Sequence, residues 1–278
     1  MLTRTISGAV MVALLIPCFI FSHLILLEVI FALLCLAACY EMLGCLGKGN
    51  AWFISIPTYV IALGLPFFVR QIDTGIPISE LILVVFIVYM FYVLGVAVFS
   101  HGKHTPSDIG LLFTMIFYII FGFTSFIAIR SIDSKGAFLY ILVFISAWIS
   151  DTGAYFTGVL FGKHKLIPDV SPKKTVEGAV GGLFFCVLAF LLYGFILGKY
   201  FDRSPDYIIL GIMGFFLSLV SMCGDLIASL IKRQFKVKDY GNLIPGHGGI
   251  MDRFDSTIAT SSVLFVLLNI PYIVQNII

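Results

Sequence analysis

Acidic side chains recur in the C-terminal half of the sequence, inside segments that are otherwise almost wholly apolar. Asp252 and Asp255 open the last apolar stretch, in HGGIMDRFD, and Asp225 ends SMCGD in the stretch before it. Residues three apart lie on one face of a helix. A thiol-free cluster of carboxylates is the ligand set of a hard cation such as Mg²⁺. We therefore predict that these three aspartates bind a metal. A structural network in which Arg233 and Arg253 pair with them remains the alternative.

Two further acids belong to the same half of the chain. Asp151 lies in AWISDTGAYFTG, and Glu177 follows SPKKT directly. With a helical rise of about 1.5 Å per residue, all five carboxylates lie within about 10–15 Å of the same ends of the predicted helices. An aspartate at the centre of a membrane costs about 2.5–3.5 kcal/mol on insertion scales. Acids gathered at one depth therefore indicate a shared cationic partner.

Basic and glycine-rich segments flank these acids. SPKKT and HGG each precede a predicted helix, and glycine lets a backbone approach an anion that a helix N-terminus attracts. Juxtamembrane lysines by themselves more often hold anionic lipid headgroups, which stays an alternative. Beside a carboxylate cluster they favour a nucleoside triphosphate. The candidates are Ser171, Lys173, Lys174, Lys232, Arg233, Lys238, His247, Gly248 and Gly249.

The elements that must position these residues are membrane-spanning helices. The chain has 278 residues, 60% apolar and only 12% charged, against about 25% charged in globular domains. Apolar runs of about 20 residues are long enough to cross a bilayer. We predict an all-α integral membrane protein rather than a soluble domain or an outer-membrane barrel. Its nine predicted spans cover residues 7–22, 24–45, 52–69, 78–99, 109–130, 137–161, 177–198, 206–231 and 250–276.

The distribution of charge predicts the topology. Twelve of the 17 Lys and Arg residues fall on the side of the N-terminus, which the positive-inside rule assigns to the cytoplasm. Loops 162–176 and 232–249 then face the cytosol. Residues 1–136 are predicted to be a scaffold that could hold dimer contacts, and 137–278 to be catalytic. Glu28 and Glu41 have no role that the sequence indicates, and a net charge of +2 gives no reason to expect nucleic acid.

Three segments together resemble a known family. SLIKRQFKVKDYGNLIPGHGGIMDRFD, residues 229–255, resembles the signature of the phosphatidate cytidylyltransferases, or CDP-diacylglycerol synthases. AWISDTGAYFTG and SPKKTVEG resemble the other typical segments of that family. The resemblance implies a multi-pass enzyme of the bacterial inner membrane, with its active site facing the cytoplasm. It also implies synthesis of CDP-diacylglycerol and pyrophosphate from CTP and phosphatidic acid, with Mg²⁺, a second cation (K⁺ or another Mg²⁺) and a homodimer.

The resemblance also implies roles for individual residues. Asp225 and Asp252 are expected as metal ligands with Asp255 close by, and Lys173 and Lys174 as catalytic cations. Two other activities remain as alternatives: a CTP-dependent kinase of a polyprenol or phytol, and an ion-coupled transporter. The expected substrate-binding residues are Asp151, Ser171, Glu177, Lys232, Arg233, Lys238, Asp239, His247, Gly248, Gly249 and Arg253.

Overall fold

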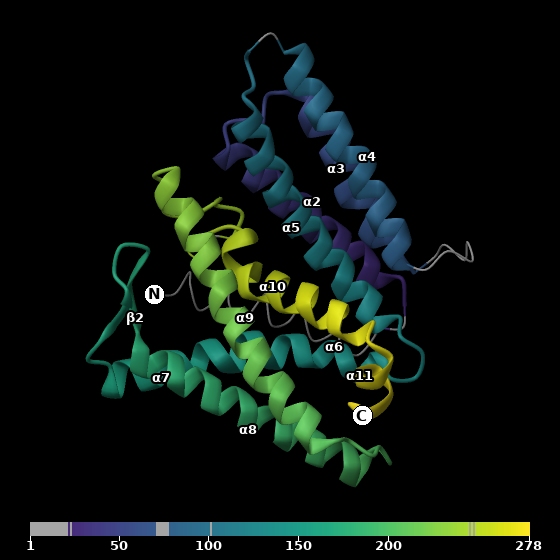
Figure 1. The fold of residues 1–278 in the computed structure, drawn as a ribbon, viewed down its shortest axis with the longest axis vertical. Coiled ribbons are helices and arrows are strands. Elements are labelled where there is room, and N and C mark those ends of the chain that lie inside the picture. The colour runs from purple at the N-terminus through teal and green to yellow at the C-terminus, as the bar shows by residue number, and fades with distance from the viewer. Residues whose placement is uncertain (1–21, 23, 71–77, 101, 245, 247) are drawn as a thin grey trace. The chain divides into compact units, whose positions relative to one another are not determined.

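The computed structural model describes residues 22, 24–70, 78–100, 102–244, 246 and 248–278 (Figure 1). Within these residues, six helical segments are long and apolar enough to cross a membrane. The chain is accordingly a multi-pass helical membrane protein. The elements are α2 Leu26–Cys45, α3 Trp52–Phe68, α4 Ile78–Phe99, α5 Pro106–Arg130, α6 Gly136–Phe144, the π-helix η1 Ile145–Ile149, α7 Ser150–Phe161, β1 Lys165–Ile167, β2 Ser171–Thr175, α8 Val176–Tyr200, α9 Tyr207–Gln234, α10 Met251–Leu268 and α11 Pro271–Asn276.

Eight of the nine predicted spans coincide with helices, and the first, 7–22, lies outside the described residues except for Ser22. Two details differ from the prediction. The span 250–276 is broken into α10 and α11, because Pro271 has no amide hydrogen and Ile270 before it is extended. The loop 162–176 contains a two-stranded antiparallel hairpin, so the fold is helical with one small sheet.

The chain forms two compact units. The first is Met1–Ala128 with Val237–Arg253, and the second is Ile129–Lys236 with Phe254–Ile278. The segment 237–253 groups with the N-terminal helices, and the predicted division at residue 136 into a scaffold and a catalytic part stays a prediction. Asp252 consequently belongs to the first unit, and Asp225 and Asp255 belong to the second.

Within the first unit, α2 packs against α3 and α5. Phe31 of α2 stacks on Phe126 of α5 with ring centroids 4.1 Å apart. One oxygen of the buried Glu28 carboxylate pairs with Arg70 at 2.6 Å, which offsets the charge of an acid that α2 carries into the core. Large apolar side chains such as Phe91, 66% exposed, point outward from α4. An apolar outer face is what a helix presents to lipid.

Within the second unit, α6, η1 and α7 follow one another as a continuous helical run, with α8 beside α7 (Figure 1). Glycines on α8 allow this close packing. A Cβ on Gly182 would lie 2.8 Å from the carbonyl oxygen of Ser150, and one on Gly181 would overlap the side chain of Thr157. The segment AWISDTGAYFTG therefore packs directly on the glycine face of the helix that follows SPKKT.

Candidate active site

Asp151 lies in the first turn of α7, directly after the π-helix η1. Short π-helical turns are rare in proteins, and those that occur often lie at functional sites, because the wider turn changes where side chains point. The adjacent Ser150 hydroxyl is 2.7 Å from that of Ser218 on α9, and both side chains are buried. This contact holds α7 against α9 at the level of Asp151.

The β-hairpin brings lysines to the same helices. Thr175, the last residue of β2, caps α8 by accepting a hydrogen bond from the amide of Gly178 at 3.1 Å. This cap fixes the strand to the helix. The preceding residue, Lys174, places its ammonium 2.7 Å from a carboxylate oxygen of Asp225 on α9, and the two side chains are 23% and 31% exposed. The nitrogen of Lys174 is buried and has no hydrogen-bond partner within the described part of the chain, so its contact with Asp225 is an ion pair.

Helices α9 and α10 meet beside Asp225. A Cβ on the neighbouring Gly224 would lie 2.9 Å from the carbonyl oxygen of Asp255, so only glycine permits this approach. The charge of Asp225 acts on both Asp151 and Asp255. The hydroxyl of Ser256 donates to Asp151 at 3.4 Å. Three helices of the second unit thus bring three aspartates into one electrostatic neighbourhood.

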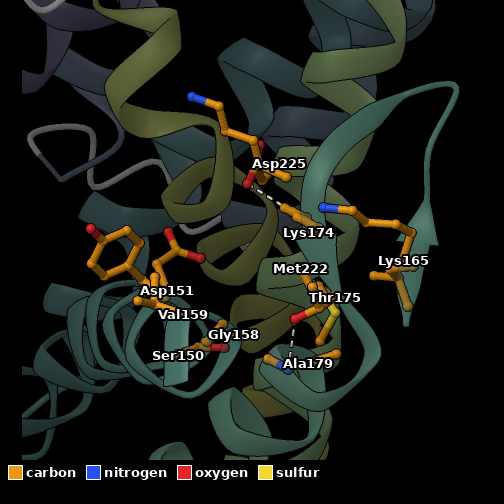
Figure 2. A pocket seen from close by; sticks show the side chains of 15 residues that line it. Ser150, Asp151, Gly158, Val159, Lys165, Lys174, Thr175, Ala179, Met222 and Asp225 are labelled. Atoms are coloured by element: carbon orange, nitrogen blue, oxygen red, sulfur yellow. Dashed lines mark hydrogen bonds and ion pairs between the residues drawn. The ribbon is translucent and has the colours of Figure 1, made fainter. Parts of the chain in front are cut away.

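A cavity of about 540 Å³ opens between α7, α8, α9 and the hairpin. Figure 2 shows Asp151 and the pair of Lys174 and Asp225 around it, with Lys165 on the hairpin side. Apolar side chains such as Val159 and Met222 form the rest of the wall. A cavity with lysines, aspartates and apolar walls can hold a phosphate group attached to an apolar chain.

Four residues predicted from the sequence line this cavity, namely Asp151, Lys173, Lys174 and Asp225. Lys165 also lines it and is missing from the prediction. The antiparallel register pairs Lys165 with Thr175, which brings this lysine next to the SPKKT strand. The short polar stretch between Lys165 and SPKKT could have predicted a hairpin, and with it the position of Lys165.

The oxygen donors of the second unit fit a hard cation in their chemistry. Among the described residues no group of three or more His, Cys, Asp or Glu side chains is arranged as a complete metal site. Mg²⁺, however, usually takes only one or two carboxylates and completes its shell with water and phosphate. Asp225, Asp255 and Asp151 supply such oxygens, so Mg²⁺ binding stays a prediction.

Asp252, in the first unit, holds the backbone of its own segment. One carboxylate oxygen accepts hydrogen bonds from the amides of Tyr240 at 2.8 Å and Gly249 at 3.0 Å. The amides of Ile250 and Met251 donate to Glu41 of α2. The amides of Gly249, Ile250 and Met251 at the start of this helix are therefore already engaged, and substrate binding by Gly249 stays a prediction. They are bonded to carboxylates of the chain itself.

Two predicted substrate-binding residues contact the hairpin region. Glu177 accepts hydrogen bonds from the amides of Lys163 and His164, and its carboxylate is 2.6 Å from the His164 ring. It therefore orders the turn before β1 and is not among the residues that line the cavity. Arg233 donates to the carbonyl of Val170 at 3.3 Å, which ties the end of α9 to the hairpin loop.

The other predicted residues occupy the two units as follows. Ser171 begins β2, and Lys232 lies in the last turn of α9 and interacts electrostatically with Asp255. Gly248 has a φ of +85°, a conformation that glycine adopts without strain. Their roles toward substrate stay predictions. Lys238, Asp239 and Arg253 are exposed in the first unit, and His247 lies outside the described residues.

Comparison with known proteins covers nearly the whole chain. The model of the Cytidylyltransferase family matches residues 2–271. A phosphatidate cytidylyltransferase of Staphylococcus saprophyticus is 35% identical over 268 residues, covering 96% of this chain and 99% of the relative. Proteins of the same name are 34% identical in Staphylococcus epidermidis and 35% identical in Staphylococcus aureus, with the same coverage. The matches include the N-terminal helices, beyond the motifs that carry the resemblance.

Proposed function

The chain belongs to the cytidylyltransferase family, and from this premise we propose that it transfers CMP from CTP to phosphatidic acid. The products are CDP-diacylglycerol and pyrophosphate. The observation that carries the proposal is the cavity in which Lys174 pairs with Asp225 at 2.7 Å beside Asp151, Lys165 and Lys173. Its cationic groups suit phosphates, and its apolar wall suits the start of a lipid chain. The relatives named phosphatidate cytidylyltransferase support the choice of substrates.

The chemistry needs charge balance more than it needs an activated nucleophile. A phosphate oxygen of phosphatidic acid is already anionic near neutral pH and attacks the α-phosphorus of CTP. A new P–O bond forms as the bond to the pyrophosphate oxygen breaks, and pyrophosphate leaves. Lys165, Lys173 and Lys174 would offset the repulsion between the two anions and stabilise the charge that develops on the leaving group.

The acids have the complementary task of holding a divalent cation. Asp225, Asp255 and Asp252 are the residues that would hold Mg²⁺. When bound, it would neutralise phosphate oxygens and act as a Lewis acid. Asp225 also pairs with the Lys174 ammonium, so one carboxylate would contact both the metal and a lysine that binds phosphate. Asp151, whose carboxylate accepts from Ser256, adds negative charge that favours retention of a cation in the cavity.

The membrane setting gives the proposed reaction its geometry. Six apolar segments support an enzyme embedded in a bilayer, where phosphatidic acid resides. The excess of Lys and Arg on one side supports a cytoplasmic N-terminus and hairpin, and hence access for CTP from the cytosol. The bacterial relatives support the inner membrane. A homodimer is proposed on the family resemblance alone.

Labelled CTP tests the reaction directly. Purified protein in micelles is supplied with phosphatidic acid, Mg²⁺ and CTP labelled at either the α- or the γ-phosphorus. We expect the α-label in lipid and the γ-label in pyrophosphate. A γ-label in lipid would instead identify a CTP-dependent lipid kinase and reject the proposal. A stereochemical analysis at the α-phosphorus adds the mechanism: inversion fits a single in-line displacement, and retention excludes it.

A further inference from the structure

Glu41 of α2 is a buried acid that bonds to a distant part of the chain. Its side chain is 3% exposed. One carboxylate oxygen accepts a hydrogen bond from the amide of Ile250 at 3.0 Å, and the other accepts from the amide of Met251 at 2.9 Å. Met251 is the first residue of α10. A carboxylate of one helix therefore caps the N-terminus of another, some 210 residues later in the chain.

Burial of the Glu41 carboxylate costs free energy of folding unless these two hydrogen bonds are formed. A buried carboxylate loses its hydration, and a negative charge near the C-terminal end of α2 opposes the dipole of that helix. The two amide hydrogen bonds offset the desolvation, and the positive end of the α10 dipole attracts the charge. Among the residues that the structure describes, the hydrogen bonds to the Glu41 carboxylate come from the amides of Ile250 and Met251, at the start of α10.

The loop that leads to α10 is built around this carboxylate. A Cβ on Gly241 would lie 2.5 Å from one oxygen of Glu41, and a Cβ on Gly249 would overlap the other. A side chain at either position would therefore displace the Glu41 carboxylate. The segment 237–253 wraps around the Glu41 carboxylate as closely as backbone atoms allow.

Asp252 belongs to the same hydrogen-bonded turn. Its carboxylate accepts from the amides of Tyr240 and Gly249, while Glu41 accepts from those of Ile250 and Met251. Three consecutive amides, from Gly249 to Met251, are thus shared between two carboxylates. A change at Glu41 must alter the position of the backbone that carries Asp252.

We propose that Glu41 is a positioning residue, which holds the first turn of α10 so that Asp252 is presented to the metal and its phosphate substrate. This inference rests on the proposed function, in which Asp252 is a metal ligand. Glu41 itself would contact neither substrate nor metal. It would act through the amides of Ile250 and Met251.

Glu41→Gln is the sharpest test, because it keeps the shape of the side chain. The amide of Gln can accept from one of the two backbone N–H groups but presents N–H to the other, so one hydrogen bond becomes a donor–donor contact. Glu28→Gln is the matched control. It removes the charge of another buried acid of α2, whose partner is Arg70 rather than the loop.

Two measurements separate positioning from general loss of stability. Hydrogen–deuterium exchange of metal-free protein follows the peptide that contains residues 248–253. Titration with Mn²⁺, used as a probe for Mg²⁺, follows metal affinity by electron paramagnetic resonance. For Glu41→Gln we expect faster exchange in that peptide and an affinity for Mn²⁺ about 10- to 100-fold weaker, as is typical when a group that orients a ligand is removed. For Glu28→Gln, neither should change.

Activity completes the test. With Glu41→Gln, the Mg²⁺ concentration for half-maximal activity should rise by about 10-fold or more, whereas Glu28→Gln lowers at most the fraction of active protein. Glu41→Asp, which keeps the charge but is one methylene shorter, should recover part of the Mn²⁺ affinity. Unchanged exchange and affinity in Glu41→Gln would overturn the inference. So would tighter CTP binding in Glu41→Ala, because the carboxylate would then merely occupy a substrate anion site.

Failure of the proposed function is a distinct result. Wild-type protein that transfers no CMP to phosphatidic acid would reject that function whatever the variants do. Wild-type protein that makes CDP-diacylglycerol, with a Glu41→Gln variant indistinguishable from it, would reject only the role of Glu41.

Discussion

The ion pair between Lys174 and Asp225 has two roles that a double-mutant cycle can separate. At 2.7 Å, with an effective dielectric constant of about 20, the Coulomb attraction is about 6 kcal/mol before desolvation is subtracted. Desolvation cancels much of this attraction, and the side chains are only about a quarter to a third exposed. We therefore expect Asp225→Asn alone to lower the free energy of unfolding by about 1–3 kcal/mol, between the values for exposed and fully buried pairs. The cause is the buried Lys174 ammonium that it leaves unpaired.

The assay compares Asp225→Asn, Lys174→Met and the double variant in detergent micelles. Unfolding reports the structural role, and transfer of CMP to phosphatidic acid reports the chemical role. In the double variant neither member of the pair is charged, so stability should recover by about 1 kcal/mol or more relative to the sum of the single changes. Activity should stay below one tenth of wild type in every variant that lacks Asp225, as for other residues that act on a metal or its substrate.

Two results would refute this reasoning. A coupling free energy below about 0.5 kcal/mol would mean that the pair contributes no more than an exposed surface contact. Activity restored in the double variant would mean that Asp225 serves only to neutralise Lys174, and the metal assignment would then fail.

Further predictions concern one residue each. Lys173→Ala should raise the KM for CTP about 3- to 10-fold, as expected for loss of about 1 kcal/mol of phosphate contact, with no change in membrane insertion. Gly181→Val should destabilise the second unit by about 1–3 kcal/mol or more, because the new side chain overlaps Thr157, and thermal unfolding would show this as a lower midpoint. Burial and the Lys48 ammonium lower the pKa of His104. As the pH falls, the His104 imidazole is therefore protonated in the unfolded chain at a higher pH than in the folded chain. The apparent Tm should then fall as the pH decreases below about 6.5. In His104→Gln this decline should be smaller.

The sequence predicted most of the helices because their signal is local. An apolar run of sufficient length must form a helix in a membrane, since every backbone group has to be hydrogen-bonded within the segment. This reasoning found the helices from α2 to α10, six segments of which are long and apolar enough to cross a membrane. It missed the break at Pro271 because the apolar run continues through the proline, and it missed the hairpin because strands of three and five residues carry little periodicity.

The sequence also indicated the chemistry of the second unit. Asp151 and Asp225 were predicted from residue type and from their common depth in the helices, and Lys174 from the basic segment before a helix. All three line one cavity. The pairing of Lys174 with Asp225 was beyond the sequence, because it depends on the hairpin that directs the lysine toward α9. A charged residue in an apolar segment signals that it has a partner, but not which one.

Residue type and order alone were enough to identify a helical membrane protein with acids and lysines suited to phosphate chemistry. Tertiary structure decided where individual hydrogen bonds go. Glu41, 209 residues before Ile250 in the chain, had no role in the sequence and is the cap of α10 in the fold. Local patterns report how each segment satisfies its own backbone, whereas a helix terminus can be satisfied by any acceptor that folding brings near.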